Sequence, residues 1–79
     1  MEKANKLLEI CKQKGYTLRQ LAKITGISIK TIEHYSIDDR FPKLKNRLII
    51  AKVLGVDWQD IFDELKYKQK KEGADYGRI

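Results

Sequence analysis

The stretch "YTLRQLAKITGISIKTIEHYS", residues 16–36, constrains the fold more than any other part of the chain. Its apolar residues recur at helical spacing in two short runs, and only Gly26 and its two neighbours separate them. Glycine suits the left-handed backbone position that closes a helix. Two short helices joined by a three- to four-residue turn containing glycine form a helix-turn-helix. The sequence therefore predicts such a pair, in which the first helix braces the second and leaves its outer face protruding.

Capping residues indicate where these two helices begin. Thr17 offers an N-cap hydroxyl, with Gln20 three residues later as its capping-box partner, and Ser28 caps the next helix. We expect helices over about residues 18–24 and from Ser28 to about Ser36. The side chains expected to face inward are Leu18, Leu21, Ala22 and Ile24 on the first helix, and Ile32 and Tyr35 on the second. Those expected on the outer side are Ile29, Lys30, Glu33 and His34.

Three further helices complete the expected fold. One runs from about residue 3 to 14 and another from about 43 to 54, each stopped by a glycine, and Asp57 can cap a third. Their expected apolar faces are Ala4, Leu7, Leu8 and Cys11, then Leu44, Leu48, Ala51 and Leu54, then Trp58, Ile61, Phe62 and Leu65. Ile49 and Val53 lie off the second of these faces. They can cover the C-terminal helix or form a dimer seam, and we favour packing within the monomer.

Length and composition limit the class of protein. The chain has 79 residues, enough for one small domain. No segment alternates apolar and polar residues as a strand does, so the predicted fold class is all-α: a compact five-helix domain over residues 1–65 and a basic, flexible tail over residues 66–79. No apolar run approaches the roughly 18 residues of a membrane helix. The lone cysteine, Cys11, indicates a reducing compartment, so we expect a soluble, cytoplasmic protein that does not contact a membrane.

Basic residues dominate most of the chain. Residues 1–56 hold 12 basic and 5 acidic side chains, residues 57–65 have a net charge of −4, and residues 66–79 have a net charge of +3. A basic body with one acidic helix is typical of a polyanion-binding protein. A charged surface that only confers solubility would give the same balance, so charge alone leaves both interpretations open.

Four stretches carry a family resemblance: "GYTLRQLAKITGISIKTI", "RFPKL", "IAKVLGV" and "DIF". In register, over roughly residues 5 to 65, they resemble the phage-repressor and Cro-type helix-turn-helix family, the XRE class. The resemblance implies a lambda-repressor-like, five-helix domain that binds double-stranded DNA. It also implies that the third helix docks in the major groove, usually within a two-fold homodimer on a palindromic operator.

The same resemblance places the third helix against the bases. The expected base contacts are Ile29, Lys30, Thr31, Glu33 and His34. Lys30 can donate to guanine O6 and N7, Glu33 can accept from cytosine N4, and Ile29 can pack on a thymine methyl group. His34 can donate to a base or a phosphate. A surface role without specific contacts stays open for each of them.

The expected phosphate contacts are Thr17, Arg19, Ser28, Arg40 and Lys43. Thr17 and Ser28 stand at helix N-termini, where free N–H groups and the positive end of the helix dipole favour a phosphate. Both are helix caps whether or not they meet DNA, and Arg19 can equally be a solvated charge.

The chain departs from the family pattern in two places. Leu18 stands where the family usually has a glutamine that contacts phosphate, which removes one clamp. Ser36-Ile37-Asp38 replaces the usual Glu-x-Gly after the third helix, although aspartate tolerates a left-handed backbone. Asp38 and Asp39 are also expected to place negative charge near the DNA flank.

Three functions remain in competition. The leading hypothesis is a sequence-specific regulator, a repressor that blocks polymerase by occupying an operator as a dimer. The alternative is an antitoxin or anti-regulator that acts mainly through a protein partner. An enzyme is the weakest hypothesis, because one His, one Cys and no glycine-rich phosphate loop offer neither a nucleophile–base pair nor a metal cluster. We accordingly expect no cofactor and no metal.

Overall fold

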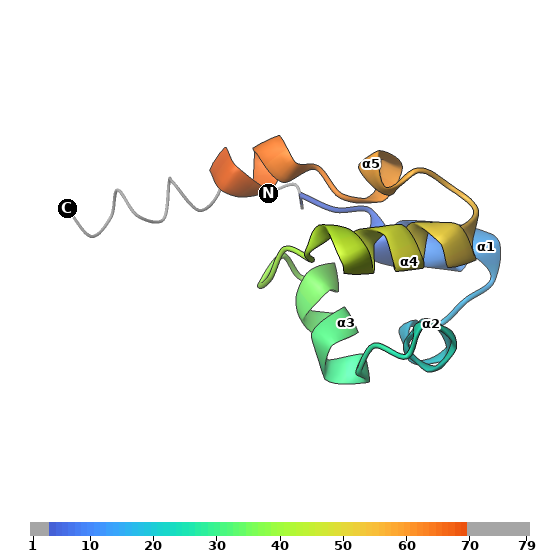
Figure 1. Ribbon diagram of the computed structural model, residues 1–79. Coiled ribbons are helices and arrows are strands. Elements are labelled where there is room, and N and C mark those ends of the chain that lie inside the picture. The colour runs from blue at the N-terminus through green and yellow to red at the C-terminus, as the bar shows by residue number, and fades with distance from the viewer. Residues whose placement is uncertain (1–3, 70–79) are drawn as a thin grey trace.

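The computed structural model describes residues 4–69, and within this span the chain forms helices joined by short connections (Figure 1). The helices are α1 (Leu7–Lys14), α2 (Leu18–Thr25), α3 (Ile29–Ser36), α4 (Leu44–Leu54) and α5 (Trp58–Ile61). Residues 64–69 are also helical. The predicted all-α fold and its five-helix order are confirmed.

The local signals around the helix-turn-helix act as expected. The Thr17 hydroxyl accepts from the Gln20 N–H at 3.0 Å, and the Gln20 amide oxygen accepts from the Thr17 N–H at 2.9 Å, which completes the capping box. Gly26 ends α2 in the left-handed region with φ of 77°. The Ser28 hydroxyl then accepts from the N–H of Thr31 at 3.1 Å and so caps α3.

One apolar core joins α1, α2, α3, α4 and α5. Its buried members are Leu7, Ile10, Cys11, Leu21, Ala22, Ile32, Tyr35, Ile50, Ala51, Leu54, Ile61 and Phe62. Ile32 and Tyr35 attach α3 to this core, as predicted. Cys11 is fully covered, and burial raises the pKa of its thiol, so this cysteine serves as a small apolar side chain.

Two inward assignments in the first half of the chain are wrong. Leu8 and Ile24 were expected in the core, but both side chains are exposed. α1 begins at Leu7 and not near residue 3, and Ile10 is buried in place of Leu8, because Leu7, Ile10 and Cys11 form one stripe at spacings of three and four residues. Ala4 is buried as expected, although it lies in a bend before the helix.

The inward face of α4 agrees with the prediction at Ala51 and Leu54 but differs from it at Leu44 and Leu48. Leu44 is 50% exposed and Leu48 is 51% exposed, whereas Ile50, Ala51 and Leu54 face the core. Apolar residues occur all around this helix, so the face that contains Leu44 and Leu48 competes with the neighbouring face that contains Ile50. Ala51 and Leu54 lie next to both, and the face with Ile50 is the buried one. Val53 packs against the core, in line with the preference for packing within the monomer.

The predicted long fifth helix is wrong after Ile61. Phe62 is extended and forms an antiparallel bridge with Asn5. Two backbone hydrogen bonds flank this bridge: the Lys6 N–H donates to the Ile61 carbonyl at 2.7 Å, and the Asp63 N–H donates to the Ala4 carbonyl at 2.8 Å. The pairing interrupts the helix, and Leu65, expected on its apolar stripe, is 68% exposed.

An aromatic cluster around Arg47 connects the C-terminal part to α4. The Arg47 guanidinium carbon lies 4.3 Å from the ring centre of Trp58 and 5.0 Å from that of Phe41. Phe41 also meets Phe62 edge-on at 6.0 Å and lies 5.1 Å from Tyr67. Trp58 and Phe62 thus have the structural roles that the sequence predicted.

Residues 4–69 include no helix long and apolar enough to cross a membrane. The predicted tail begins within this span, where residues 66–69 are helical, and its remainder lies outside the described residues.

Candidate nucleic-acid interface

The pair formed by α2 and α3 carries the candidate interface. In Figure 1 the N-terminal end of α3 lies beside α2 and extends away from α4 and α5. Lys30 and Glu33 are exposed on α3, and Thr31 and His34 are half-buried. Because Ile32 and Tyr35 hold the opposite side in the core, this outer face is presented on a fixed support.

Ile29 differs from the other predicted base contacts. It was expected mainly on the outer side, but it is half-buried and packs against the core. Only part of its side chain is therefore available to a thymine methyl group.

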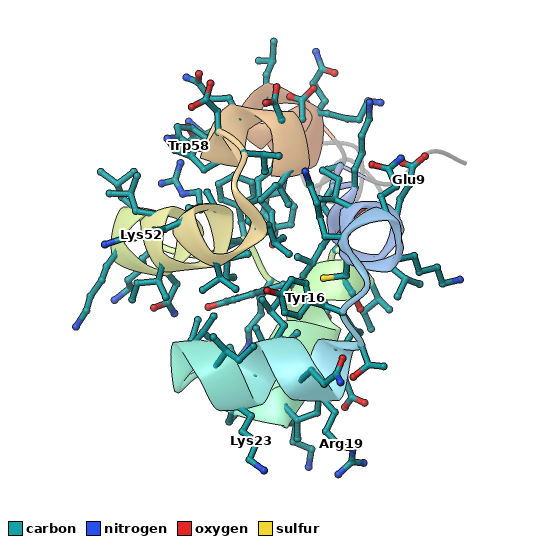
Figure 2. The ribbon with its side chains drawn as sticks, turned by 90° about the vertical axis from the view of Figure 1, so that its right-hand side faces the viewer. Glu9, Tyr16, Arg19, Lys23, Lys52 and Trp58 are labelled. Carbon is teal, nitrogen blue, oxygen red and sulfur yellow. The ribbon has the colours of Figure 1, made fainter. Side chains whose placement is uncertain are left out.

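Basic side chains continue this surface onto α2. Arg19 is exposed, and in Figure 2 it points away from the body of the molecule together with Lys23. Lys23 was not among the predicted contacts, although its position four residues after Arg19 places both side chains on one face of the helix. Arg40 and Lys43 are exposed in the connection between α3 and α4.

The hydroxyls at the start of α3 are engaged with each other. The Ser28 hydroxyl donates to the Thr31 hydroxyl oxygen at 2.9 Å, besides accepting from the Thr31 N–H. The Thr17 hydroxyl is similarly occupied by its capping box. A phosphate at either helix start would therefore meet the first-turn N–H groups more readily than these hydroxyls.

The two acidic residues after α3 are held in different ways. Asp38 is buried in the left-handed region with φ of 63° and accepts hydrogen bonds from the Ala4 N–H and the Asn5 side-chain amide. The tolerance of aspartate for this backbone is thus confirmed. The expectation that Asp38 exposes its charge near the DNA flank is wrong, because its carboxylate joins the end of α3 to the N-terminal segment.

Asp39 pairs with the predicted base reader His34. The His34 Nδ1 and the Asp39 Oδ2 lie 2.5 Å apart, with the two side chains 35% and 52% exposed. The negative charge expected at this flank therefore lies against an imidazole ring.

A family model described as helix-turn-helix matches residues 7–61, from the first residue of α1 to the last of α5. The chain belongs to the Cro-type (XRE) helix-turn-helix family. It is therefore a DNA-binding regulator of the XRE type, a regulatory class that is not typically enzymatic. Neither the curated proteins nor the solved structures yielded a match.

Leu18 is a departure from the usual XRE sequence pattern. Its half-buried side chain packs against the core at the position where the family usually places a phosphate-contacting glutamine. Gln20 uses its amide oxygen to accept from the Thr17 N–H, and this leaves its side-chain NH2 group as a donor at the start of α2. At this end of α2 the exposed cation is Arg19.

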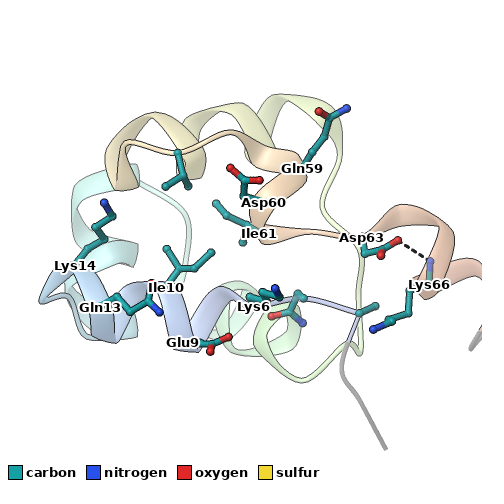
Figure 3. Close-up of a pocket in the computed structure, with 13 residues that line it drawn as sticks. Lys6, Glu9, Ile10, Gln13, Lys14, Gln59, Asp60, Ile61, Asp63 and Lys66 are labelled. Carbon is teal, nitrogen blue, oxygen red and sulfur yellow. Dashed lines mark hydrogen bonds between the residues drawn. The ribbon is translucent and has the colours of Figure 1, made fainter.

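A concave region lies on another part of this XRE domain, away from α2 and α3. A hollow of about 510 Å³ separates α1 from the chain around α5, and no residue of α2 or α3 lines it (Figure 3). Lys6, Glu9, Lys14 and Asp60 contribute mixed charge to its walls, and the Lys66 N–H donates to the Asp63 carboxylate at 2.9 Å. Over residues 4–69 no group of three His, Cys, Asp or Glu side chains could hold a metal ion.

Proposed function

We propose that this protein is a cytoplasmic transcriptional repressor that occupies a palindromic operator as a homodimer. The observation that supports this most is the polar outer face of α3, with Lys30 and Glu33 exposed and the opposite side buried in the core. Arg19 and Lys23 of the neighbouring α2 add exposed positive charge (Figure 2). A single α-helix of this kind fits the major groove of DNA. Occupation of an operator then excludes polymerase without a separate effector region.

The residues take two roles in this proposal. Lys30, Glu33 and His34, with contributions from Ile29 and Thr31, read base edges, because they occupy the outer side of α3. Arg19, Lys23, Arg40 and Lys43, with the N-termini capped by Thr17 and Ser28, bind phosphates and set the register. Phosphate contacts act alike on all sequences, whereas base contacts discriminate between them.

This division can be tested with sites selected from a random duplex pool. Lys30→Ala should lower affinity for the selected site by about tenfold or more while leaving affinity for random duplex nearly unchanged. Lys43→Ala should weaken both duplexes alike and reduce the slope of log affinity against log salt by about 1. Fluorescence anisotropy over a salt series measures all of these quantities, with Lys52→Ala, an exposed lysine at the far end of α4, as the control.

Equal losses on both duplexes for Lys30→Ala and Lys43→Ala would refute α3 as the reading element. A wild-type protein that binds no duplex even at low salt would instead favour the alternative, an antitoxin or anti-regulator. Such a protein would engage its partner through another surface, of which the hollow between α1 and α5 is the candidate.

A further inference from the structure

We propose that Tyr67 is a positioning residue for DNA binding, because its ring packs on Phe41 in the connection between α3 and α4. This connection carries Arg40 and Lys43, two of the cations proposed to contact phosphates. The proposal therefore rests on the proposed function. It extends the interface to a residue beyond Ile61, where the match to the family model ends.

The connection between α3 and α4 is attached to the body of the molecule by its two apolar residues. Arg40 and Lys43, which flank them, are exposed. Between these cations Pro42 is fully buried, and Phe41 is half-buried and packs against the core. Because both cations lie within two residues of Phe41, the position of Phe41 decides where they are presented.

The Phe41 ring is held by one side chain of α4 and by two rings that follow the family span. The Arg47 guanidinium carbon lies 5.0 Å from its ring centre. Phe62 meets it edge-on at 6.0 Å, and Tyr67 lies at 5.1 Å with an angle of 35° between the ring planes. Aromatic pairs at such separations attract each other beyond the area that they bury. Loss of the nearer ring, that of Tyr67, should therefore loosen Phe41.

Local chemistry directs Tyr67 to this place. The extended backbone at Phe62 ends α5, and a short helix over residues 64–69 follows. The Asp63 carboxylate accepts from the Lys66 N–H at 2.9 Å, and its carbonyl accepts from the Tyr67 N–H at 3.0 Å, so Asp63 caps this helix. Figure 1 shows the helix in orange-red, near the end of α4 at which the connection from α3 arrives.

A fixed connection favours binding to phosphates. Backbone that is mobile before binding loses conformational freedom when its side chains engage a ligand, and this loss weakens the affinity. Where the Tyr67 ring already holds the connection, that freedom is lost on folding and not on binding. Because phosphate contacts carry no sequence information, the contribution of Tyr67 should be the same for every duplex.

The first experiment measures the connection without DNA. The N–H groups of Asp39 and Arg40 donate to the His34 carbonyl at 2.9 Å and 3.4 Å, so their hydrogen exchange reports opening of this segment. Tyr67→Ala should speed exchange at both amides about fivefold or more, because the ring no longer holds the connection. Tyr67→Phe, which keeps the ring, should exchange as the wild type does. Unchanged exchange in Tyr67→Ala, or an equal increase in the control Leu65→Ala, would overturn the proposal.

The second experiment measures binding to a random duplex by fluorescence anisotropy at low salt, in two backgrounds. In the wild type, Tyr67→Ala should lower the affinity about fivefold or more, and Tyr67→Phe should leave it unchanged. In the variant Arg40→Ala/Lys43→Ala, Tyr67→Ala should have no further effect, because the groups that it positions are gone. A domain that had merely lost stability would lose affinity in both backgrounds.

Leu65→Ala is the matched control for both experiments. It shortens an exposed apolar side chain of the same short helix without changing charge. Its binding should equal that of its parent in each background.

The outcomes separate the two levels of the hypothesis. Equal losses from Tyr67→Ala in the two backgrounds, or no loss in the wild type, would refute the positioning role. A wild type that binds no duplex would instead refute the proposed function, and wild-type affinity in Arg40→Ala/Lys43→Ala would refute the phosphate contacts assumed for these two cations. In either case hydrogen exchange would still decide whether Tyr67 holds the connection.

Discussion

At the scale of single residues, two adjacent aspartates illustrate how position decides the role of one chemical group. The Asp38 carboxylate is buried and binds the N-terminal segment, whereas Asp39 is exposed and faces the ring of His34. Both roles depend on the left-handed backbone of Asp38, because it turns the chain back toward α1 and leaves Asp39 beside α3.

Asp38→Asn should destabilise the fold markedly. Asparagine tolerates the same backbone conformation, but one acceptor oxygen becomes a donor that faces the Ala4 N–H or the Asn5 amide. Hydrogen bonds to a charged group contribute about 1.5–3 kcal/mol, so we expect the free energy of unfolding to fall by about that amount. Urea unfolding followed by Trp58 fluorescence measures it. Asp39→Asn, an exposed neighbour, should change it by less than about 0.5 kcal/mol, and equal effects of the two would contradict the clamp.

At the scale of elements, local chemistry predicted where α2 and α3 begin and end, but it predicted neither the start of α1, nor the end of α5, nor every helix face. The capping box at Thr17, the cap at Ser28 and the glycine after α2 depend on neighbours within a few residues, which the sequence displays directly. The burial of α4 depends on its partners instead, and apolar residues around the whole helix left two faces in competition. The His34–Asp39 pair was also not predicted, since it requires the turn geometry that Asp38 provides.

Arg47 adds an aromatic contact to the apolar core that already joins α4 to the C-terminal segment. Its guanidinium lies over both Trp58 and Phe41, and its Nε is buried without a hydrogen-bond partner among the residues described. Desolvation strengthens cation–π contacts, so Arg47→Ala should lower the free energy of unfolding by about 1–2 kcal/mol. For a domain of this size the melting temperature should then fall by roughly 4–8 °C per kcal/mol, measured by far-UV circular dichroism.

The control for Arg47→Ala is Lys45→Ala, which removes an exposed cation from the same helix. Its effect should stay within about 0.5 kcal/mol. If both variants melt alike, the aromatic contacts of Arg47 contribute nothing beyond surface charge.

At the scale of the whole molecule, the ends of the domain are joined by contacts that no local pattern reveals. The bridge between Asn5 and Phe62 pairs the segments just outside the two ends of the matched family span, and it ends α5 after Ile61. Periodicity around Phe62 predicted a continuing helix, because Trp58, Ile61 and Leu65 have helical spacing. Pairing with the N-terminal segment prevailed over that local preference.

The proposed homodimer requires a surface, and the outer face of α4 is the candidate. Leu44 and Leu48 are four residues apart, about half exposed, and lie in the helix that directly follows the connection from α3. A two-fold contact here would link two reading helices, which must enter successive major grooves about 34 Å apart. Half-exposed leucines contribute about 1 kcal/mol each when covered, and a two-fold contact covers both leucines of each protomer. The double variant Leu44→Gln/Leu48→Gln should therefore weaken self-association on the order of a thousandfold. Sedimentation over a dilution series measures this loss, and binding to a two-half-site duplex should fall while binding to a single half-site stays unchanged.

The matched control for the α4 double variant is Leu8→Gln, which changes an exposed leucine on α1. If the α4 double variant sediments and binds as the wild type does, the dimer must use another face, since two polar amides cannot replace the apolar contact that this surface would supply.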